Sequence, residues 1–259
     1  DNNNTQAIVD LVNNNNVSAL TMHFLGGPWG NTNSPSKLDQ LGLMNSTTPI
    51  VFSHASYVTT DDAELLRKYD QYISTTPESE MHYGHGHHYN PLIQDQSALG
   101  VDTHFTFSTD IITQANWNIP RNNPMSANQA FTLATRSGAL ALRRPDLGVL
   151  ATGNKADVIV FDGDSPNMLG WSDPVAAVIL HSNVGDIRHV MVGGEWRKRD
   201  GQLVTKQNRT DVQTKFLESA KRIQKIWLET PLPEMQGEFG GEYVDAFTVD
   251  AVRGNGTGY

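Results

Sequence analysis

Residues 49–66, PIVFSHASYVTTDDAELL, decide the fold class of this chain. The segment begins with PIVFS, an apolar run of the length of a β-strand. Thr59 and Thr60 follow and can cap a helix, and the two aspartates after them are well placed in a first helical turn. A buried strand followed directly by a helix predicts one unit of a parallel βα fold.

The same alternation extends to both sides of this segment. Residues 18–24, SALTMHF, form an expected earlier strand, and 71–75 and 97–101 form two expected later strands. Ser126 opens the pattern S-x-x-Q, a capping box, which predicts a helix through Leu142. Because strands that alternate with helices pair in parallel, we predict an α/β fold.

After Leu142 the sequence texture changes. Segments 157–162, 176–180 and 187–192 are rich in β-forming residues and are separated by Gly, Asn and Asp. This spacing predicts a small β domain.

Residues 211–229 return to helical periodicity, with apolar side chains on one face that we expect to pack into a core. We therefore divide the chain into 1–143, 144–208 and 209–259.

Composition excludes several classes of function. The chain has 259 residues and a formal net charge of -9, which disfavours a nucleic-acid partner. No apolar run approaches the roughly 18 residues that a membrane span needs. There is no cysteine, so any metal must bind to His, Asp or Glu.

Localisation stays open between cytoplasmic and secreted. Five N-x-[ST] sequences fit either chance or glycosylation. They begin at Asn3, Asn16, Asn45, Asn208 and Asn255.

Three polar residues, His23, His54 and Asp102, follow apolar strands. In a parallel βα barrel, catalytic groups gather at that end of the strands. A lone histidine in such a place is usually structural, but three such positions, one of them a carboxylate, favour a zinc-type site with an open position for water.

Several segments resemble the amidohydrolase superfamily, in its chlorohydrolase and cyclic-deaminase branch. Residues 50–55 (IVFSHA), 74–86 (STTPESEMHYGHG) and 98–110 (ALGVDTHFTFSTD) are similar to the sixth, seventh and eighth barrel strands of that branch. Residues 148–162 (GVLATGNKADVIVFD) and 187–203 resemble strands of its composite β-sandwich. The order and spacing of these motifs carry the resemblance, which covers roughly 17–205.

The resemblance implies the architecture of the chain. It would be the C-terminal half of a TIM-like (β/α)8 barrel, with strands five to eight, part of a composite β-sandwich and a C-terminal helix. The family's H-x-H pair, which supplies two more metal ligands, has no counterpart before His23. The chain is then expected to need a missing N-terminal half or another chain.

The resemblance also implies roles for the site residues. His23 and Asp102 would bind metal, and His54 would contact the water or substrate, or bind a second metal in a binuclear site. Asp102 would take a proton from the attacking water. Zinc is the expected metal, with iron or manganese as alternatives. A metal lowers the pKa of its bound water to about 7, so hydroxide would attack an sp² carbon and expel ammonia or an amine from a small, possibly cyclic C–N compound.

The loop after the seventh strand needs separate consideration. His85 is expected to line the substrate pocket, and Glu78 to bind substrate or to serve as a helix-start carboxylate. His85 and His87 form an H-x-H, but the flanking glycines predict a loop that does not aim both rings. Two alternatives to an active enzyme remain: a catalytically inactive fragment of the same fold, and a His-rich metal-binding module at 82–88.

Overall fold

The computed structural model describes residues 2–30, 33–85, 93–103, 110–117 and 125–231. For residues 2–4 it describes the backbone alone. The chain forms two compact units, Asp1–Lys206 and Gln207–Tyr259. Each unit is described by itself.

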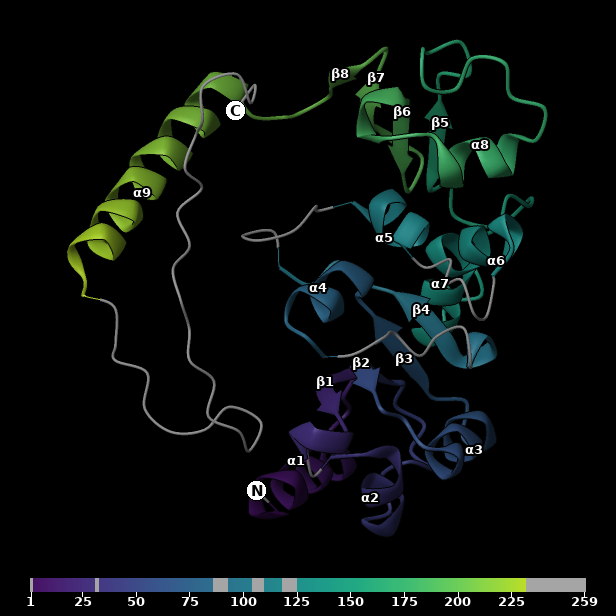
Figure 1. The fold of residues 1–259 in the computed structure, drawn as a ribbon, viewed down its shortest axis with the longest axis vertical. Helices are drawn as coiled ribbons and strands as arrows, with labels where there is room; N and C mark the ends of the chain where they lie inside the picture. The colour runs from purple at the N-terminus through teal and green to yellow at the C-terminus, as the bar shows by residue number, and fades with distance from the viewer. Residues whose placement is uncertain (1, 31–32, 86–92, 104–109, 118–124, 232–259) are drawn as a thin grey trace, which may run out of the picture. The chain divides into compact units, whose positions relative to one another are not determined.

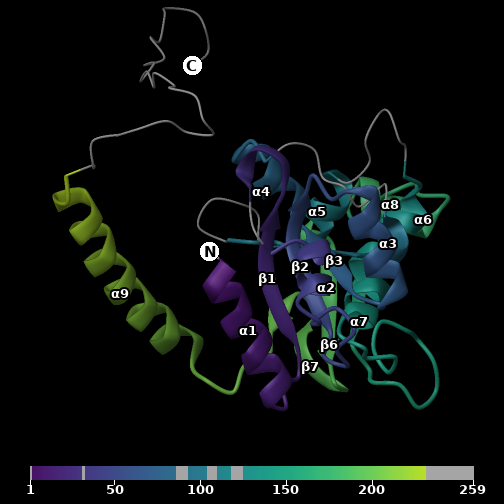
Figure 2. The same cartoon turned by 90° about the horizontal axis from the view of Figure 1, so that it is seen from below.

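The first unit is built on a four-stranded parallel sheet in the order β1-β2-β3-β4 (Figures 1 and 2). Its strands are β1 (Leu20–Leu25), β2 (Ile50–Ser56), β3 (Tyr72–Thr75) and β4 (Ser97–Leu99). Neighbours in sequence are neighbours in the sheet, which is the order of strands in a (β/α) barrel. The predicted α/β class and all four predicted strands are confirmed.

Helices cover one face of this sheet. They are α1 (Asn2–Asn14), α2 (Pro35–Gln40) and α3 (Thr60–Lys68). Phe24, Phe52 and Ile73 point to this face and pack with Leu38 of α2 and Leu66 of α3. All five are at most 2% exposed, so this core fixes the pleat and thereby the residues at the strand ends.

The sequence signals at the start of α3 are confirmed. Thr59 is the N-cap, and its hydroxyl and the Asp62 carboxylate form a capping box. Asp62 also accepts hydrogen bonds from the backbone N–H and the hydroxyl of Ser36. One buried carboxylate therefore both starts α3 and ties α2 to it.

The opposite face of the sheet carries a smaller apolar cluster. Val51, Tyr72 and Ala98 pack there against Ala141. Ala141 belongs to the segment expected as one helix from Ser126, and the capping box of Ser126 with Gln129 is present. That segment consists of α6 (Ala127–Thr132), a π-helical turn (Leu133–Ser137) and α7 (Gly138–Ala141).

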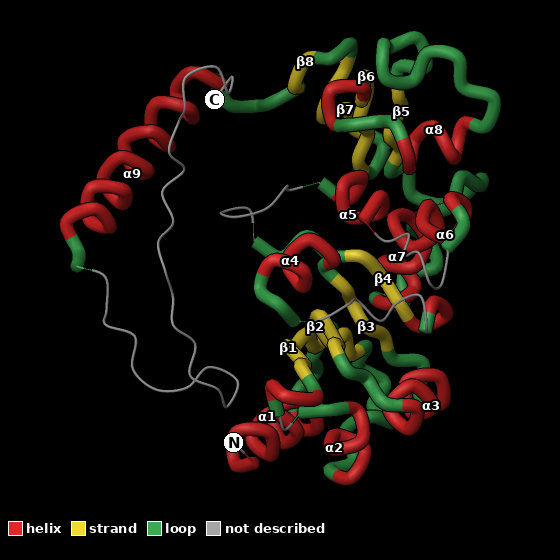
Figure 3. The backbone as a smooth tube through the Cα atoms, viewed as in Figure 1, coloured by secondary structure: helices red, strands yellow, loops and turns green. Residues whose placement is uncertain are grey.

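The expected β-structure at 176–180 is wrong. These residues belong to the helix α8 (Pro174–Leu180), drawn in red in Figure 3. Asp173 caps it by accepting hydrogen bonds from two backbone N–H groups, and a proline at the first helical position favours the helical start. Ile179 of α8 packs with Ala115 of α5 (Ile111–Trp117) and Ala130 of α6. Tertiary packing and the cap thus override the β propensity.

A second sheet of four antiparallel strands follows, in the order β5-β6-β7-β8. Its strands are β5 (Val158–Phe161), β6 (Ile187–Val192), β7 (Glu195–Arg199) and β8 (Gln202–Leu203). Asp157 precedes β5 and accepts a hydrogen bond from the Gly193 N–H at the β6–β7 turn, a structural contact at a strand start. Apolar side chains such as Ile159, 53% exposed, remain on its surface.

The second unit contains α9 (Arg209–Glu229), which confirms the predicted helix. Its expected apolar face is largely exposed: Phe216 is 65% and Trp227 62% exposed, and no residue of α9 is buried. Within its own unit this helix buries none of its described side chains, and its packing into a core stays a prediction. Within the same residues, no helix combines the length and apolar character needed to cross a bilayer.

Candidate functional site

The carboxyl end of β2 is irregular where it carries His54. Phe24 of β1 pairs with His54, but the next pair is Leu25 with Ser56, so Ala55 is skipped. His54 and Ala55 have φ angles of 68° and 53°, a left-handed conformation that costs free energy for residues with a Cβ. Bulges of this kind re-aim side chains next to active sites. The result is a histidine that is only 4% exposed.

His23 and His54 lie together, as expected from their shared place at strand ends. Their rings stack with centroids 5.3 Å apart. His23 is exposed, and its backbone carbonyl accepts a hydrogen bond from the Asn33 amide at 2.5 Å. Two imidazoles on neighbouring strands are thus held side by side, one open to solvent and one buried.

Polar groups from the start of α4 (Pro77–His82) surround Nδ1 of His54. The Thr76 hydroxyl oxygen lies 3.0 Å from Nδ1, and Oε1 of Glu80 lies 3.8 Å from it. Glu80 is fully buried, and its Oε1 also accepts the Thr76 N–H at 2.9 Å. Burial raises the pKa of the Glu80 carboxyl above its ordinary value, against the opposing effect of the hydrogen bond with His54.

Asp102 follows β4 and is exposed. Its φ of 64° is again left-handed, and its Oδ2 accepts a hydrogen bond from the Ser79 hydroxyl at 2.5 Å. The chain reaches it through Gly100, where a Cβ would come within 2.8 Å of the Ser74 hydroxyl, so a larger residue would require that side chain to shift. The charge of Asp102 is close enough to affect the pKa values of Glu80 and His85.

His85 belongs to a group of aromatic rings beside His54. Its ring centroid lies 5.4 Å from that of His54, 4.9 Å from that of Trp29 and 5.8 Å from that of Tyr83. Burial lowers the pKa of the His85 imidazole below its ordinary value, because burial disfavours the charged ring. This arrangement suits a residue that lines a pocket. His87 and His88 lie outside the described residues.

The beginning of the loop that we expected after the seventh strand is a short helix, α4. Glu78 is in its first turn and is partly buried. Its carboxylate accepts a hydrogen bond from the amide of Gln114, and Gln114 in turn accepts the Glu78 N–H. Glu78 therefore lies at the start of a helix, as one of its two interpretations expected. Its contact with substrate remains a prediction.

The donor atoms suit a divalent metal in type but not in number. Imidazole nitrogen and carboxylate oxygen are zinc ligands, yet within the described ranges no three His, Asp or Glu side chains lie close enough to share an ion. The structure thus joins His23 with His54 and His85, and connects Asp102 to the same short helix through Ser79.

Sequence reasoning missed three residues of this site: Thr76, Ser79 and Glu80. All three lie in the quoted motif STTPESEMHYGHG. Glu80 is four residues after Thr76, and on a helix such positions share one face. That spacing is the signal that could have indicated them.

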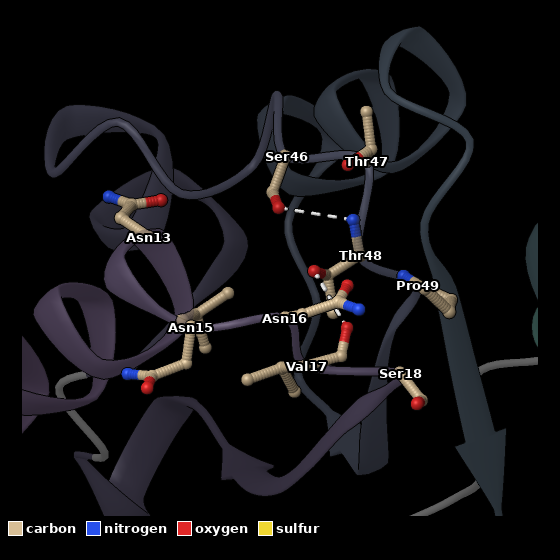
Figure 4. Close-up of a pocket in the computed structure, with 10 residues that line it drawn as sticks. Asn13, Asn15, Asn16, Val17, Ser18, Ser46, Thr47, Thr48 and Pro49 are labelled. Atoms are coloured by element: carbon tan, nitrogen blue, oxygen red, sulfur yellow. Dashed lines mark hydrogen bonds between the residues drawn. The ribbon is translucent and has the colours of Figure 1, made fainter.

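A cavity of ≈ 540 Å³ lies at the other end of the strands (Figure 4). It is lined by Val12, Asn13, Asn15, Asn16, Val17, Ser18, Ser46, Thr47, Thr48 and Pro49. None of these side chains titrates, so the cavity has no general acid, general base or strong metal ligand of its own.

The sequence profile of the amidohydrolase family matches residues 8–197. The chain belongs to the amidohydrolase family. One protein similar in sequence to this chain is the 5-methylthioadenosine/S-adenosylhomocysteine deaminase of Desulfitobacterium hafniense. It is 28% identical over 178 residues, which are 65% of this chain and 41% of the deaminase.

Solved structures show the same fold. A zinc-bound adenosine deaminase from Xanthomonas campestris superimposes with a TM-score of 0.77 at 17% identity, over 87% of this chain and 55% of that structure. An atrazine chlorohydrolase from Arthrobacter aurescens, complexed with zinc and atraton, gives 0.69 at 17% identity over 82% and 51%. The chain thus spans about half the length of the relatives it matches.

Proposed function

We propose that this amidohydrolase chain contributes His23, His54 and Asp102 to a metal-dependent site that hydrolyses a C–N bond of a small, possibly cyclic compound. The stacked pair of His23 and His54 carries the proposal. Because Thr76 engages Nδ1 of His54, Nε2 is the atom left for a ligand. Deaminases among the relatives and zinc in the structural neighbours support the reaction class and the metal.

The remaining metal ligands would come from outside the described residues. Within those residues β1 pairs only with β2, and β4 only with β3, so each outer strand has one edge without a partner strand. Edge strands present unpaired N–H and C=O groups that can accept another strand. We propose that a further barrel half, in the same polypeptide or in another chain, pairs there and completes the ligand set. The described strands would then be strands five to eight.

A divalent metal, with zinc expected and iron or manganese as alternatives, would supply an activated water when bound. His23 and Asp102 would hold it, and His54 would join them in a binuclear site. Asp102 would accept a proton from the attacking water, and the tetrahedral carbon would expel ammonia or an amine that takes up that proton. His54 would contact the water or substrate through Nε2, while His85 and Glu78 would line the substrate.

The antiparallel sheet has a structural part in this proposal. We propose that residues 144–208 form a segment of the family's composite β-sandwich, between the barrel part at 1–143 and the helix and tail at 209–259. The exposed apolar residues of β5 support this, because a sandwich strand buries one face against a second sheet.

Metal titration of site variants tests the function. The chain is loaded with Zn²⁺, and affinity is measured by equilibrium dialysis for His23→Ala, Asp102→Ala and, as a matched control, His82→Ala, an exposed residue of the His-rich segment. We expect the first two to lower affinity at least about tenfold and the control to leave it unchanged. Loss of affinity only in His82→Ala would favour a His-rich metal-binding module instead.

Ammonia release separates the enzyme from an inactive fragment of the same fold. The chain is assayed with the barrel half that completes it, on a panel of aminated heterocycles. We expect steady release that requires the metal and His54. A fully loaded, assembled barrel that releases no product from the panel would support the inactive alternative.

A further inference from the structure

One buried carboxylate behind the candidate site has no assigned role. Glu80 is fully buried, and its second oxygen, Oε2, has no hydrogen-bond partner. Buried polar atoms without partners are rare in folded proteins and cost free energy, so each one calls for an explanation. The other oxygen, Oε1, caps the Thr76 N–H and lies 3.8 Å from Nδ1 of His54.

Capping alone does not explain a carboxylate at this position. A glutamine has the same shape, accepts the same N–H and would spare the cost of burying a charge. What only the carboxyl group adds, in its ionised form, is negative charge beside Nδ1 of His54. Such charge favours the imidazole tautomer that carries its proton on the facing nitrogen.

We propose that Glu80 is a positioning residue that, together with Thr76, holds His54 in the tautomer protonated at Nδ1. The Nδ1–H then donates to the Thr76 hydroxyl, in the field of the Glu80 carboxylate. The lone pair is left on Nε2, where a metal or a water proton can be bound. For its catalytic meaning the inference rests on the proposed hydrolytic function.

The same turn of α4 also holds the second candidate residue. Ser79, which is fully buried, donates its hydroxyl hydrogen to Oδ2 of Asp102. His54 and Asp102 come from different strands and both have left-handed backbones, so neither is oriented by its own strand alone. A single helical turn therefore fixes both side chains relative to one another.

The tautomer of His54 can be read directly. Two-bond ¹H–¹⁵N correlation spectra of the ¹⁵N-labelled full chain, recorded at alkaline pH where imidazoles are neutral, distinguish Nδ1–H from Nε2–H. We expect Nδ1–H in the wild type. Glu80→Gln keeps the cap on Thr76 and removes the charge, and should lower the Nδ1–H to Nε2–H ratio about tenfold.

Two further variants keep the test decisive. Asp186→Asn removes another buried carboxylate, one that is 5% exposed and bonds Asn167 and Asn183 near β6, and should leave the His54 ratio unchanged. Thr76→Val removes only the hydroxyl and should also lower the ratio, which provides the readout if Glu80→Gln does not fold.

Three results would overturn the inference: Nε2–H in the wild type, an unchanged ratio in folded Glu80→Gln, or, where that variant does not fold, an unchanged ratio in Thr76→Val. Zn²⁺ titration of the same samples separates the inference from the proposed function. A chain with the expected tautomers that binds no zinc, even when its barrel is completed, would refute the function and leave the positioning role of Glu80 standing.

Discussion

The two ends of the parallel sheet differ in how they satisfy their buried polar groups. At the amino end, the fully buried Gln71 accepts the Ile50 N–H and donates to the carbonyls of Met44, Ser46 and Thr48. At the carboxyl end, buried atoms without partners gather within the described residues. They belong to Ser56, Thr75, Glu80 and His85, whereas the amino end has one such atom, Oε1 of Gln96 directly before β4.

The difference shows that cavity size and chemistry are separate properties. The cavity of ≈ 540 Å³ lies at the amino end, where the side chains are neutral and the buried amide is fully paired. The imidazoles and carboxylates lie at the carboxyl end, on left-handed backbone at His54 and Asp102. Unpaired polar atoms and left-handed backbone both cost stability, and their gathering around His54 supports the proposed site at the carboxyl end.

The largest expected effect is at the carboxyl end. Asp102→Asn keeps an acceptor for the Ser79 hydroxyl and removes the charge that would bind metal and take the proton. We expect the hydrolysis rate of the completed enzyme to fall by about 10³-fold, within the range for loss of a general base. Steady-state kinetics on the metal-loaded protein check this. A rate within about threefold of wild type would show that Asp102 is not the base.

At the amino end, Gln71→Ala should affect stability and not chemistry. The substitution leaves four backbone groups, three of them buried, without the Gln71 side chain as partner, which we expect to lower the free energy of unfolding by about 3 kcal/mol. Urea unfolding followed by circular dichroism measures it. The zinc affinity of the folded variant should match that of wild type. A large loss of affinity would contradict the view that the amino end serves stability and the carboxyl end serves metal binding.

A smaller effect depends on pH. Arg67 donates two hydrogen bonds to Asp95, at 2.6 and 3.0 Å, and this hydrogen bonding holds the pKa of the Asp95 carboxyl below its ordinary value of 3.8. A depressed folded-state pKa contributes stability above pH 3.8 that is lost as the pH falls through the folded value. Both side chains are about half exposed, so Arg67→Gln should cost only about 0.5 kcal/mol at neutral pH.

Thermal unfolding of Arg67→Gln and wild type at a series of pH values tests the direction of this pH dependence. The difference between the two unfolding temperatures should become smaller as the solution becomes more acidic. A gap that widens toward acid would mean that the ion pair does not set the titration of Asp95.

The smallest expected effect is in the wall of the amino-end cavity. Asn15 is exposed, and its side-chain amide donates a hydrogen bond to the carbonyl of Leu11 in α1. Asn15→Ala should change the free energy of unfolding by less than about 0.5 kcal/mol and leave zinc affinity unchanged. A strong loss of zinc affinity in this variant would mean that the cavity, and not the strand ends, contributes to binding.

Local signals in the sequence determined much of this protein. Apolar runs of strand length gave the four parallel strands, and hydroxyl caps at Thr59 and Ser126 gave two helix starts, because both signals depend on near neighbours in the chain. Strand ends in a parallel sheet meet at one edge, so His23 and His54 could be expected together before any coordinates.

Tertiary structure alone decided the rest. The bulge that turns His54, and the buried carboxylate of Glu80 behind it, depend on contacts between β1, β2 and α4, which no local pattern contains. The segment at 176–180 is helical because its packing against α5 and α6 outweighs a β propensity worth only about 1 kcal/mol. The periodicity at 211–229 fixed a helix but not its burial, because periodicity specifies an apolar face and only the fold supplies the surface that covers it.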